Sequence, residues 1–294
     1  MKIGVVYPQN ETHGDPRGVG LIGRAAEELG YDSILFYDHV VGAEHADREP
    51  PLWGPYTEED SFHDPFVAFG YLAAVTSRIE LATGVLILPQ RQTVLAAQQA
   101  ADADLLSGGR VRLGVGTGWN WVEYDALGVP YEGRGARLNE QIEVMRLLWA
   151  EPLVTFSGRF HELDRCCINP RPGRRIPIFA GGFSEAAYRR GGTVCDGFTF
   201  AGDVDAAVEG MARVRHHLRE SGRQHLVDEE AFAFELILTR ARTPQQIVET
   251  TLRWQAAGGT GVSVLTQKAG LATIDEHVEY LALVISALDG AGAR

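Results

Sequence analysis

The chain has 294 residues, of which 45% are hydrophobic and 22% charged, a composition typical of a folded globular protein. Its formal net charge of −12 argues against nucleic acid or an anionic membrane surface as the main partner, because both would repel it. The apolar runs are far shorter than the roughly 20 residues that cross a bilayer. Three cysteines without metal-ligand spacing fit a reducing compartment, and we expect a cytoplasmic protein with no membrane span.

Short β-branched runs alternate with longer stretches of helical spacing along the whole chain, as in parallel α/β proteins. The predicted strands lie at residues 3–7, 33–37, 79–83, 111–115, 176–180, 197–200, 232–238 and 262–265. The predicted helices lie at residues 18–29, 65–76, 93–106, 138–149, 184–191, 204–221, 244–257 and 274–288. Eight strand–helix pairs are the number that closes a (β/α)8 TIM barrel, and we expect a single such domain with insertion segments over residues 1–294.

Two insertions interrupt this pattern. Residues 42–63 are irregular and rich in Pro, Glu and His, and we expect this long loop to act as a lid. The second insertion contains a predicted hairpin around residues 155–161. In the helix at 93–106, the apolar side chains at core-facing spacings are Val94, Leu95, Ala97, Ala101, Leu105 and Leu106.

The residues just past each strand line the catalytic face of such a barrel. Thr117-Gly118 follow the fourth predicted strand and Gly181-Gly182 follow the fifth. Glycine-rich loops of this kind let backbone N–H groups converge on a phosphate. Short glycine motifs also occur in turns of no function, so the pattern alone leaves phosphate binding and a tight turn equally open.

Asp38-His39, after the second strand, is the best acid/base candidate. Histidine titrates near neutrality, and a neighbouring carboxylate can fix its tautomer. The alternative is a structural histidine, which is the more common case for an isolated one. No cluster of His and carboxylate ligands follows the strands, so we expect no metal.

Three tryptophans lie in loops at the expected catalytic face: Trp53, Trp119 and Trp121. Tryptophan beside a glycine-rich loop can wall a planar ring system, although core packing is the alternative. Together with His63, we expect these side chains to line the substrate pocket.

Four segments carry a family resemblance: Asp38-His39, TSRIELATGV at 76–85, GGRVRLGVGTGWN at 108–120 and RIPIFAGG at 175–182. In this order and at these separations, they resemble the bacterial luciferase-like monooxygenase superfamily, and most closely its coenzyme F420-dependent oxidoreductases. The resemblance covers nearly the whole chain. It implies a barrel whose mouth holds the tricyclic ring of F420 or, as the alternative, FMN.

The resemblance also implies residue roles. A cis peptide at Gly84-Val85 would press on the ring, and Thr117, Gly118, Gly181 and Gly182 would meet the cofactor phosphate. His39 would act near the reacting carbon, preceded by Asp38. Trp119 stands where a sugar-phosphate dehydrogenase of the family has a glutamate proton donor, so that substrate is not carried over. Glu123 replaces the donor only if its loop folds inward.

The resulting hypothesis is an F420-dependent oxidoreductase that transfers hydride between the deazaflavin and a small organic substrate, and the arginine-rich composition favours F420. Five arginines could offset the glutamates of the F420 tail: Arg171, Arg174, Arg175, Arg189 and Arg190. The alternatives are a two-component FMN-dependent monooxygenase, which needs a flavin reductase partner, and a non-catalytic flavin-binding subunit. The resemblance also implies a homodimer.

Overall fold

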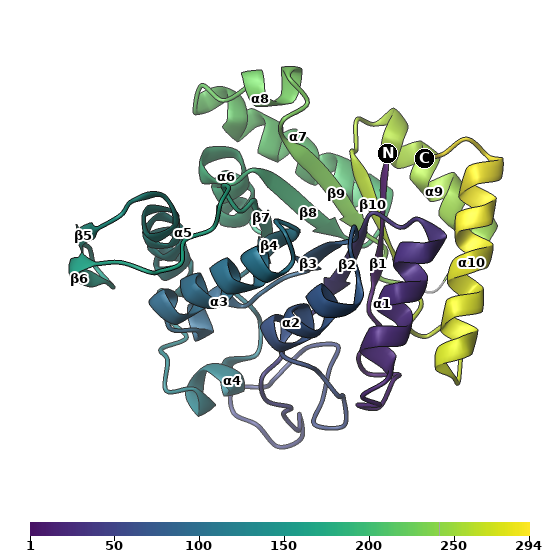
Figure 1. The fold of residues 1–294 in the computed structure, drawn as a ribbon, viewed down its shortest axis with the longest axis horizontal. Helices are drawn as coiled ribbons and strands as arrows, with labels where there is room; N and C mark the ends of the chain where they lie inside the picture. The colour runs from purple at the N-terminus through teal and green to yellow at the C-terminus, as the bar shows by residue number, and fades with distance from the viewer. Residues whose placement is uncertain (241) are drawn as a thin grey trace.

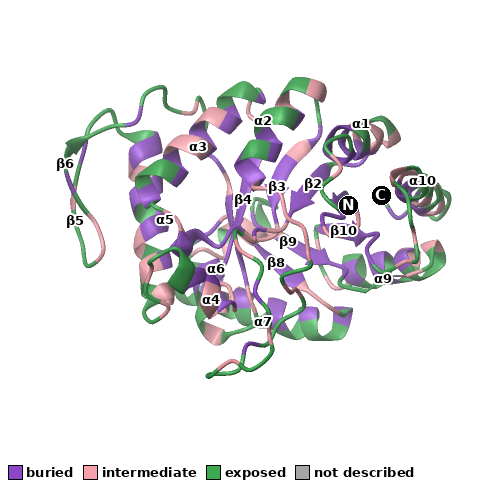
Figure 2. Ribbon diagram, turned by 90° about the horizontal axis from the view of Figure 1, so that it is seen from below, coloured by how far each residue is buried: buried purple, intermediate pink, exposed green. Residues whose placement is uncertain are grey.

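Eight parallel strands close into a barrel in the computed structural model, which describes residues 1–240 and 242–294. Around the barrel the order is β1-β10-β9-β8-β7-β4-β3-β2, and Figure 2 shows the ring from the end at which the strands finish. The strands are β1 (Lys2–Val6), β2 (Ser33–Phe36), β3 (Glu80–Thr83), β4 (Val111–Val115), β7 (Ile178–Gly181), β8 (Gly197–Ala201), β9 (Ala233–Ile237) and β10 (Gly261–Leu265). The predicted TIM barrel is confirmed, with every predicted strand overlapping an observed one.

The helices form an outer ring around the barrel, and they run back from its lower end in Figure 1 to its upper end. They are α1 (Gly18–Leu29), α2 (Pro65–Val75), α3 (Thr93–Leu106), α5 (Arg134–Ala150), α6 (Glu185–Val194), α7 (Val204–Glu220), α9 (Pro244–Ala256) and α10 (Ile274–Gly290). Three short elements lie outside the predicted set: η1 (Leu88–Gln90), α4 (Trp121–Ala126) and α8 (His225–Asp228). None of the described helices combines the length and hydropathy that a membrane span requires.

Local sequence signals set several helix boundaries. The Asp64 side chain accepts hydrogen bonds from the backbone N–H groups of Phe66 and Val67, and Pro65 occupies the first helical position of α2. Thr243 and Thr273 form capping boxes at the starts of α9 and α10. These caps satisfy N–H groups that have no partner within the helix, so each helix begins where its cap residue stands.

The expected core face of α3 is correct for Ala97 and Ala101, which are buried, and wrong for its four larger residues. Val94, Leu95, Leu105 and Leu106 are exposed, whereas its buried face consists largely of alanines. Small side chains let α3 approach its neighbours closely, and it contacts both α2 and α5. The large apolar residues therefore point outward, because the apolar stripe of this helix is broader than its contact with the barrel.

The second insertion forms a two-stranded arm between β4 and β7. Its strands β5 (Val154–Ser157) and β6 (Glu162–Cys166) pair antiparallel, as the predicted hairpin requires, and the arm projects from the side of the barrel (Figure 1). The first insertion, residues 42–63, has no regular secondary structure and lies at the lower end of Figure 1, where the strands finish. It is therefore placed to cover the barrel mouth.

Candidate active site

The parallel strands bring the predicted site residues to one end of the barrel. Asp38-His39 follow β2, Gly84-Val85 follow β3, and Thr117-Gly118 follow β4. Gly181 ends β7, with Gly182 directly after it. Because β2, β3, β4 and β7 are consecutive in the barrel, these loops form one continuous sector of the mouth.

His39 is held by a buried carboxylate. Its Nδ1 lies 3.3 Å from both carboxylate oxygens of Glu123, a residue that is only 1% exposed. Glu123 also accepts hydrogen bonds from the backbone N–H groups of Val40 (2.9 Å) and Val41 (3.3 Å). The loop that carries Glu123 thus does fold inward.

This environment controls the ionisation of Glu123. Burial raises the pKa of its carboxyl, but the hydrogen bond and charge of His39 and the backbone donor of Val41 outweigh burial, so the net pKa is lowered. An ionised Glu123 accepts a hydrogen bond from the Nδ1–H of His39, which leaves Nε2 as the nitrogen that can exchange a proton. Within the described part of the chain, His39 Nε2 has no hydrogen-bond partner, and the His39 side chain is 11% exposed.

Asp38 is not the partner of His39, contrary to the expectation that its carboxylate fixes the histidine tautomer. Its carboxylate accepts from Arg91 Nη2 at 2.6 Å and from the backbone N–H of Ile87 at 2.8 Å. Arg91 also binds Asp64, the cap of α2. Neighbours along a strand end point in different directions, so Asp38 fixes the loop after β3 while Glu123 contacts the histidine.

The Gly84–Val85 peptide bond is cis, as the resemblance implied. The Val85 side chain then lies between the two glycine loops. A Cβ built at Gly116 would lie 2.5 Å from Val85, and one at Gly181 would lie 2.6 Å from it. Only glycine allows this approach, so the loops after β3, β4 and β7 form one packed unit.

The two glycine loops present unpartnered backbone donors. Among the described residues, nothing accepts a hydrogen bond from the N–H groups of Thr117, Gly118 or Gly182. Gly118 has φ +65°. The loop is held in place by Tyr124, whose Oη donates a hydrogen bond to the Thr117 carbonyl at 2.7 Å. Fixed, unpaired N–H groups of this kind are suited to an anion such as a phosphate.

Aromatic side chains surround the His39 ring. The ring centroids of Phe62, Tyr56 and Trp119 lie 4.8, 5.1 and 5.7 Å from it. Phe62 and Tyr56 belong to the 42–63 segment, and Trp119 follows β4. We call these three side chains the aromatic box. The segment also packs on Trp119 at Gly54, where a Cβ would lie 2.2 Å from the indole.

The other predicted pocket residues, Trp53, Trp121 and His63, lie in three different surroundings. Trp53 is 79% exposed and does not wall the site. Trp121 begins α4 and lies under the guanidinium of Arg48, 5.9 Å from the ring centroid. His63 lies at the end of the lid, where its backbone N–H donates to the buried Gln9 at 2.9 Å. Its ring centroid is 6.4 Å from that of Tyr7.

The arginines expected near a cofactor tail do not gather at the mouth. Arg171, Arg174 and Arg175 precede β7, so they lie at the opposite end of the barrel. Arg174 binds Asp104 and Arg175 binds Asp196. Arg190 is buried and ties α6 to α5 through Asn139 and Gly135, and Arg189 is an exposed side chain of α6.

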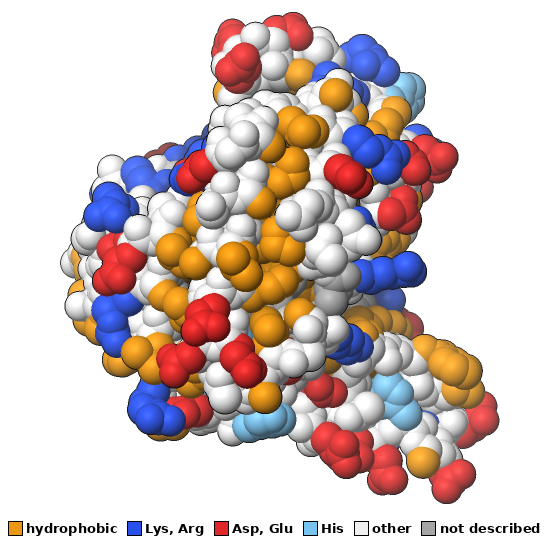
Figure 3. Space-filling model, turned by 90° about the vertical axis from the view of Figure 1, so that its right-hand side faces the viewer, with side chains coloured by type: hydrophobic (Ala, Val, Ile, Leu, Met, Phe, Trp, Pro, Cys, Tyr) orange, Lys and Arg blue, Asp and Glu red, His pale blue; other side chains and the backbone are white. Residues whose placement is uncertain are grey.

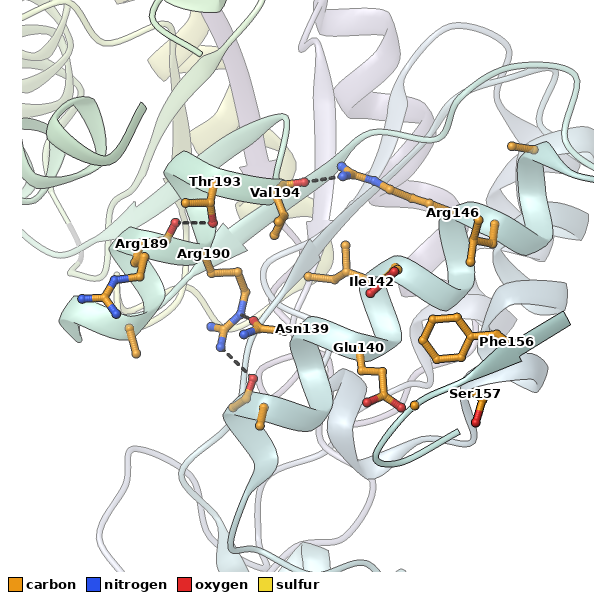
Figure 4. A pocket seen from close by; sticks show the side chains of 17 residues that line it. Asn139, Glu140, Ile142, Arg146, Phe156, Ser157, Arg189, Arg190, Thr193 and Val194 are labelled. Atoms are coloured by element: carbon orange, nitrogen blue, oxygen red, sulfur yellow. Dashed lines mark hydrogen bonds between the residues drawn. The ribbon is translucent and has the colours of Figure 1, made fainter. Parts of the chain in front are cut away.

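The Arg189–Arg190 region borders a groove of about 1180 Å³ on the outside of the barrel, between α5, α6 and the β5–β6 arm. Two of its arginines bind partners within the chain, as Figure 4 shows for Arg190 and Arg146. The Glu140 carboxylate accepts from the backbone N–H groups of Arg159 and Phe160 in the arm. The groove is wide, but these contacts join the arm and α6 to α5.

Sequence reasoning missed the aromatic partners Tyr56 and Phe62 and treated Glu123 only as a conditional substitute. A local signal for Glu123 exists. Asn120 is followed three residues later by Glu123, and the Asn120 side chain caps α4 by accepting from the N–H groups of Val122 and Glu123. The capping pattern predicts that a helix starts here, and the first turn of this helix carries Glu123 into the barrel mouth.

Comparison with known proteins gives the family of this barrel. The family model for luciferase-like monooxygenases matches residues 1–282. The chain belongs to this family. It is an oxidoreductase of the F420- or flavin-dependent class.

Three compared proteins differ in the cofactor that their names give. An F420-dependent glucose-6-phosphate dehydrogenase from Kineococcus radiotolerans is 29% identical over 269 residues, covering 83% of this chain and 74% of the relative. An F420-dependent secondary alcohol dehydrogenase in complex with an F420-acetone adduct superposes with a TM-score of 0.78 at 16% identity, over 98% of both chains. The FMN-bound oxygenating constituent of 3,6-diketocamphane monooxygenase from Pseudomonas putida has a TM-score of 0.76 at 14% identity, over 99% of this chain and 98% of that chain. At these identities the two structures support the fold alone. Of the three compared proteins, two are named for F420 and one holds FMN.

Proposed function

We propose that the protein is an F420-dependent oxidoreductase that transfers hydride between the deazaflavin and a small organic substrate. The observation that carries the proposal is the buried His39–Glu123 pair, which leaves His39 Nε2 open at the barrel mouth. A hydride transfer to or from an alcohol or carbonyl carbon requires one proton to move as well. His39 is the group in this position that can move it.

The residues around His39 fit a phosphorylated tricyclic cofactor. The N–H groups of Thr117, Gly118 and Gly182 would bind its phosphate, and Gly84-Val85 would lie against its ring. When bound, F420 supplies a two-electron hydride donor or acceptor. The chain itself positions the substrate between that ring and the aromatic box, limits access of water, and exchanges the proton at His39 Nε2.

Glu123 has the supporting role in this arrangement. Its ionised carboxylate holds the proton on His39 Nδ1, so that Nε2 accepts the substrate proton in oxidation and returns it in reduction. Asp38 acts further away, because it fixes the loop that contains Gly84-Val85 through Ile87 and Arg91.

Cofactor titration tests the proposal. Purified protein is titrated separately with F420 and with FMN, and binding is followed by the absorbance and fluorescence of each cofactor. Tight binding of F420 is expected. Binding of FMN without F420 would overturn the proposal in favour of a two-component monooxygenase served by a flavin reductase. Cofactor binding without turnover of any alcohol or carbonyl substrate would instead support a non-catalytic flavin-binding subunit.

The expected homodimer has a candidate surface on α2 and α3, the two helices that face the viewer in Figure 1. Its large exposed apolar residues are Val67, Tyr71, Val94, Leu95, Leu105 and Leu106. The α2 sequence contains no charged residue. Two copies that each carry a net charge of −12 repel one another, so an uncharged apolar face is where a second copy can pack with least repulsion.

A paired substitution tests this surface. We expect Val67→Asp with Leu106→Asp to convert a dimer into a monomer, measured by analytical ultracentrifugation, because the two residues are 73% and 71% exposed and would place charges in the interface. Leu283→Asp on α10 is the matched control. Figure 3 shows apolar side chains on that side as well, but only Leu21 and Leu283 are large and more than a third exposed on α1 and α10. A dimer that survives the first change and dissociates with the second would place the interface on α1 and α10.

A further inference from the structure

We propose that the site selects uncharged, apolar substrates, such as aromatic or alkyl alcohols and their carbonyl counterparts, and rejects anionic ones, including phosphate esters. The inference rests on the proposed function, because it names the substrate class of the same site. Two features carry it: the aromatic box around His39 and the charge of the lid over residues 42–63.

The aromatic box gives the substrate an apolar wall. Phe62, Tyr56 and Trp119 have their ring centroids within 5.7 Å of that of His39 and are all partly buried. Burial raises the pKa of the Tyr56 phenol, so this side chain is neutral at every physiological pH. A substrate beside His39 Nε2 therefore meets one polar contact and several ring faces, which favours an apolar body with a single hydroxyl or carbonyl group.

The lid adds a strongly acidic border. Residues 42–63 contain six acidic side chains and one arginine. Figure 3 shows acidic side chains gathered at the lower end of the molecule, where the loops after the strands lie. A substrate that enters past this segment crosses a region of negative potential, which repels a carboxylate or phosphate.

Among the described residues, the arginine that contacts the loop after β2 is already paired with carboxylates. Arg91 is bound by Asp38 and Asp64. Arg48, the arginine of the lid, donates to the Glu44 carbonyl at 2.5 Å and covers Trp121. The basic side chains of the loops after β9 and β10, Arg240 and Lys268, stand two strands or more from β2. A phosphorylated substrate beside His39 would therefore compete with two carboxylates for the charge of Arg91.

The acidic border also repels the anionic cofactor, but the two ligands use different parts of the mouth. The N–H groups suited to a phosphate lie on the loops after β4 and β7, whereas His39 and the lid contact each other beside β2. Within this one sector of the mouth, backbone donors on the loops after β4 and β7 can bind an anion, whereas the carboxylates of the lid repel one.

Three probes with one ring and different charges test the proposal: benzyl alcohol, benzoate and benzylammonium. Each is titrated by calorimetry into the full-length protein at pH 8, with and without bound cofactor. Benzyl alcohol should bind at least about tenfold more tightly than benzoate at low salt. The difference should narrow as ionic strength rises, because added salt screens the lid charges but not the ring contacts.

Two sets of variants separate charge from packing. Glu58→Gln with Glu59→Gln removes two exposed lid charges and should strengthen benzoate binding about two- to threefold. The matched control is Glu229→Gln with Glu230→Gln, two exposed residues beside α8 at the opposite end of the barrel, which should leave benzoate binding unchanged. Phe62→Ala should weaken benzyl alcohol binding about fivefold, because a ring contact is lost.

The proposal is overturned if benzoate binds as tightly as benzyl alcohol, if benzylammonium binds no more tightly than benzoate, or if benzyl alcohol does not bind at millimolar concentration. It is also overturned if the lid and control variants change benzoate binding equally. The cofactor titration of the same samples is a separate measurement. Failure of F420 to bind would refute the proposed function, whereas F420 binding combined with preferred benzoate binding would refute only the substrate class.

Discussion

The barrel mouth and the outer groove differ in what their polar groups are bound to. In the groove of about 1180 Å³ between α5, α6 and the arm, Arg190, Arg146 and Glu140 all bind fixed partners within the chain. At the mouth, His39 is fixed on one side by Glu123 and keeps Nε2 without a partner, and three backbone N–H groups have no acceptor. Polar groups that are held in place but lack a hydrogen-bond partner can bind a ligand without losing an internal contact.

Size alone therefore does not identify the chemical site. The groove is broad because the two-stranded arm projects beside α5 and α6. The contacts at its edges hold these elements together. The mouth is covered by its own lid, and its aromatic rings pack on His39. Charged residues in the groove should therefore affect stability, and residues at the mouth should affect binding and turnover.

The largest expected effect is on turnover at the mouth. His39→Ala should lower kcat about 10²- to 10⁴-fold with the proposed class of substrate, because it removes the proton-exchanging group. Cofactor affinity should change little, since the phosphate donors are backbone groups of other loops. Steady-state kinetics and cofactor titration measure the two quantities separately.

Arg189→Ala in the groove is the matched control for the histidine change. Arg189 is exposed on α6 and borders the groove, so its removal should leave kcat within about twofold of the wild type. Full turnover by the His39 variant, or an equal loss in both variants, would contradict the assignment of the chemistry to the mouth.

Glu123→Gln should lower kcat about 10- to 100-fold, because the amide no longer holds the proton on His39 Nδ1. The pH profile of kcat should shift as well, and Glu123→Asp should restore part of the activity by returning the carboxylate. A loss of kcat with an unchanged pH profile would indicate that Glu123 supports the fold and does not position the histidine.

The pH dependence of the unfolding free energy gives a second test of the environment of Glu123. The pKa of Glu123 is lower in the folded protein than its ordinary value of about 4.3, so ionised Glu123 stabilises the fold above that pH. The stabilisation is lost as the pH falls through the folded-state pKa. The difference in unfolding free energy between the wild type and Glu123→Gln, measured by urea denaturation, should therefore be full at pH 7 and shrink below about pH 4.

The smallest of these effects concerns the glycine loop after β4. Gly118→Ala should weaken cofactor binding about tenfold, because the new Cβ would lie 2.8 Å from Ile87 and shift the N–H groups of the loop. Gly128→Ala is the matched control, since Gly128 has nearly the same φ, +66° against +65°, but open space around it. Both variants should lose about 1 kcal/mol of stability from the left-handed backbone, Gly118→Ala should lose more because of its contact with Ile87, and only Gly118→Ala should lose affinity.

Much of the fold was predictable from local pattern. All eight barrel strands and eight of the helices follow from the alternation of β-branched runs with helical spacing, and their caps come from residues such as Asp64 and Thr273. The outward face of α3 was not predictable, because Leu95 and Leu106 have core-like spacing and only the neighbouring helices decide which side is covered.

The site was likewise predictable from the sequence only in part. The sequence singled out His39 and the two glycine loops, since residues after parallel strands share one end of a barrel. It paired His39 with Asp38, its neighbour in the chain, whereas the observed partner is Glu123, 84 residues away. Contacts at this separation depend on how the loops pack, and the sequence gives only a weak sign of them in the Asn120 cap of α4.

The sequence by itself thus determined the barrel, the end of it at which the predicted site residues gather, and the family to which the chain belongs, because hydrophobic period and strand-end motifs are local properties. Only the tertiary structure decided which carboxylate holds His39, which aromatic rings surround it, that the Trp53 side chain is exposed, and that three of the five arginines lie at the opposite end of the barrel. The physical reason is that side-chain direction and loop contact are set by packing between segments distant in the chain, and no local pattern encodes that packing.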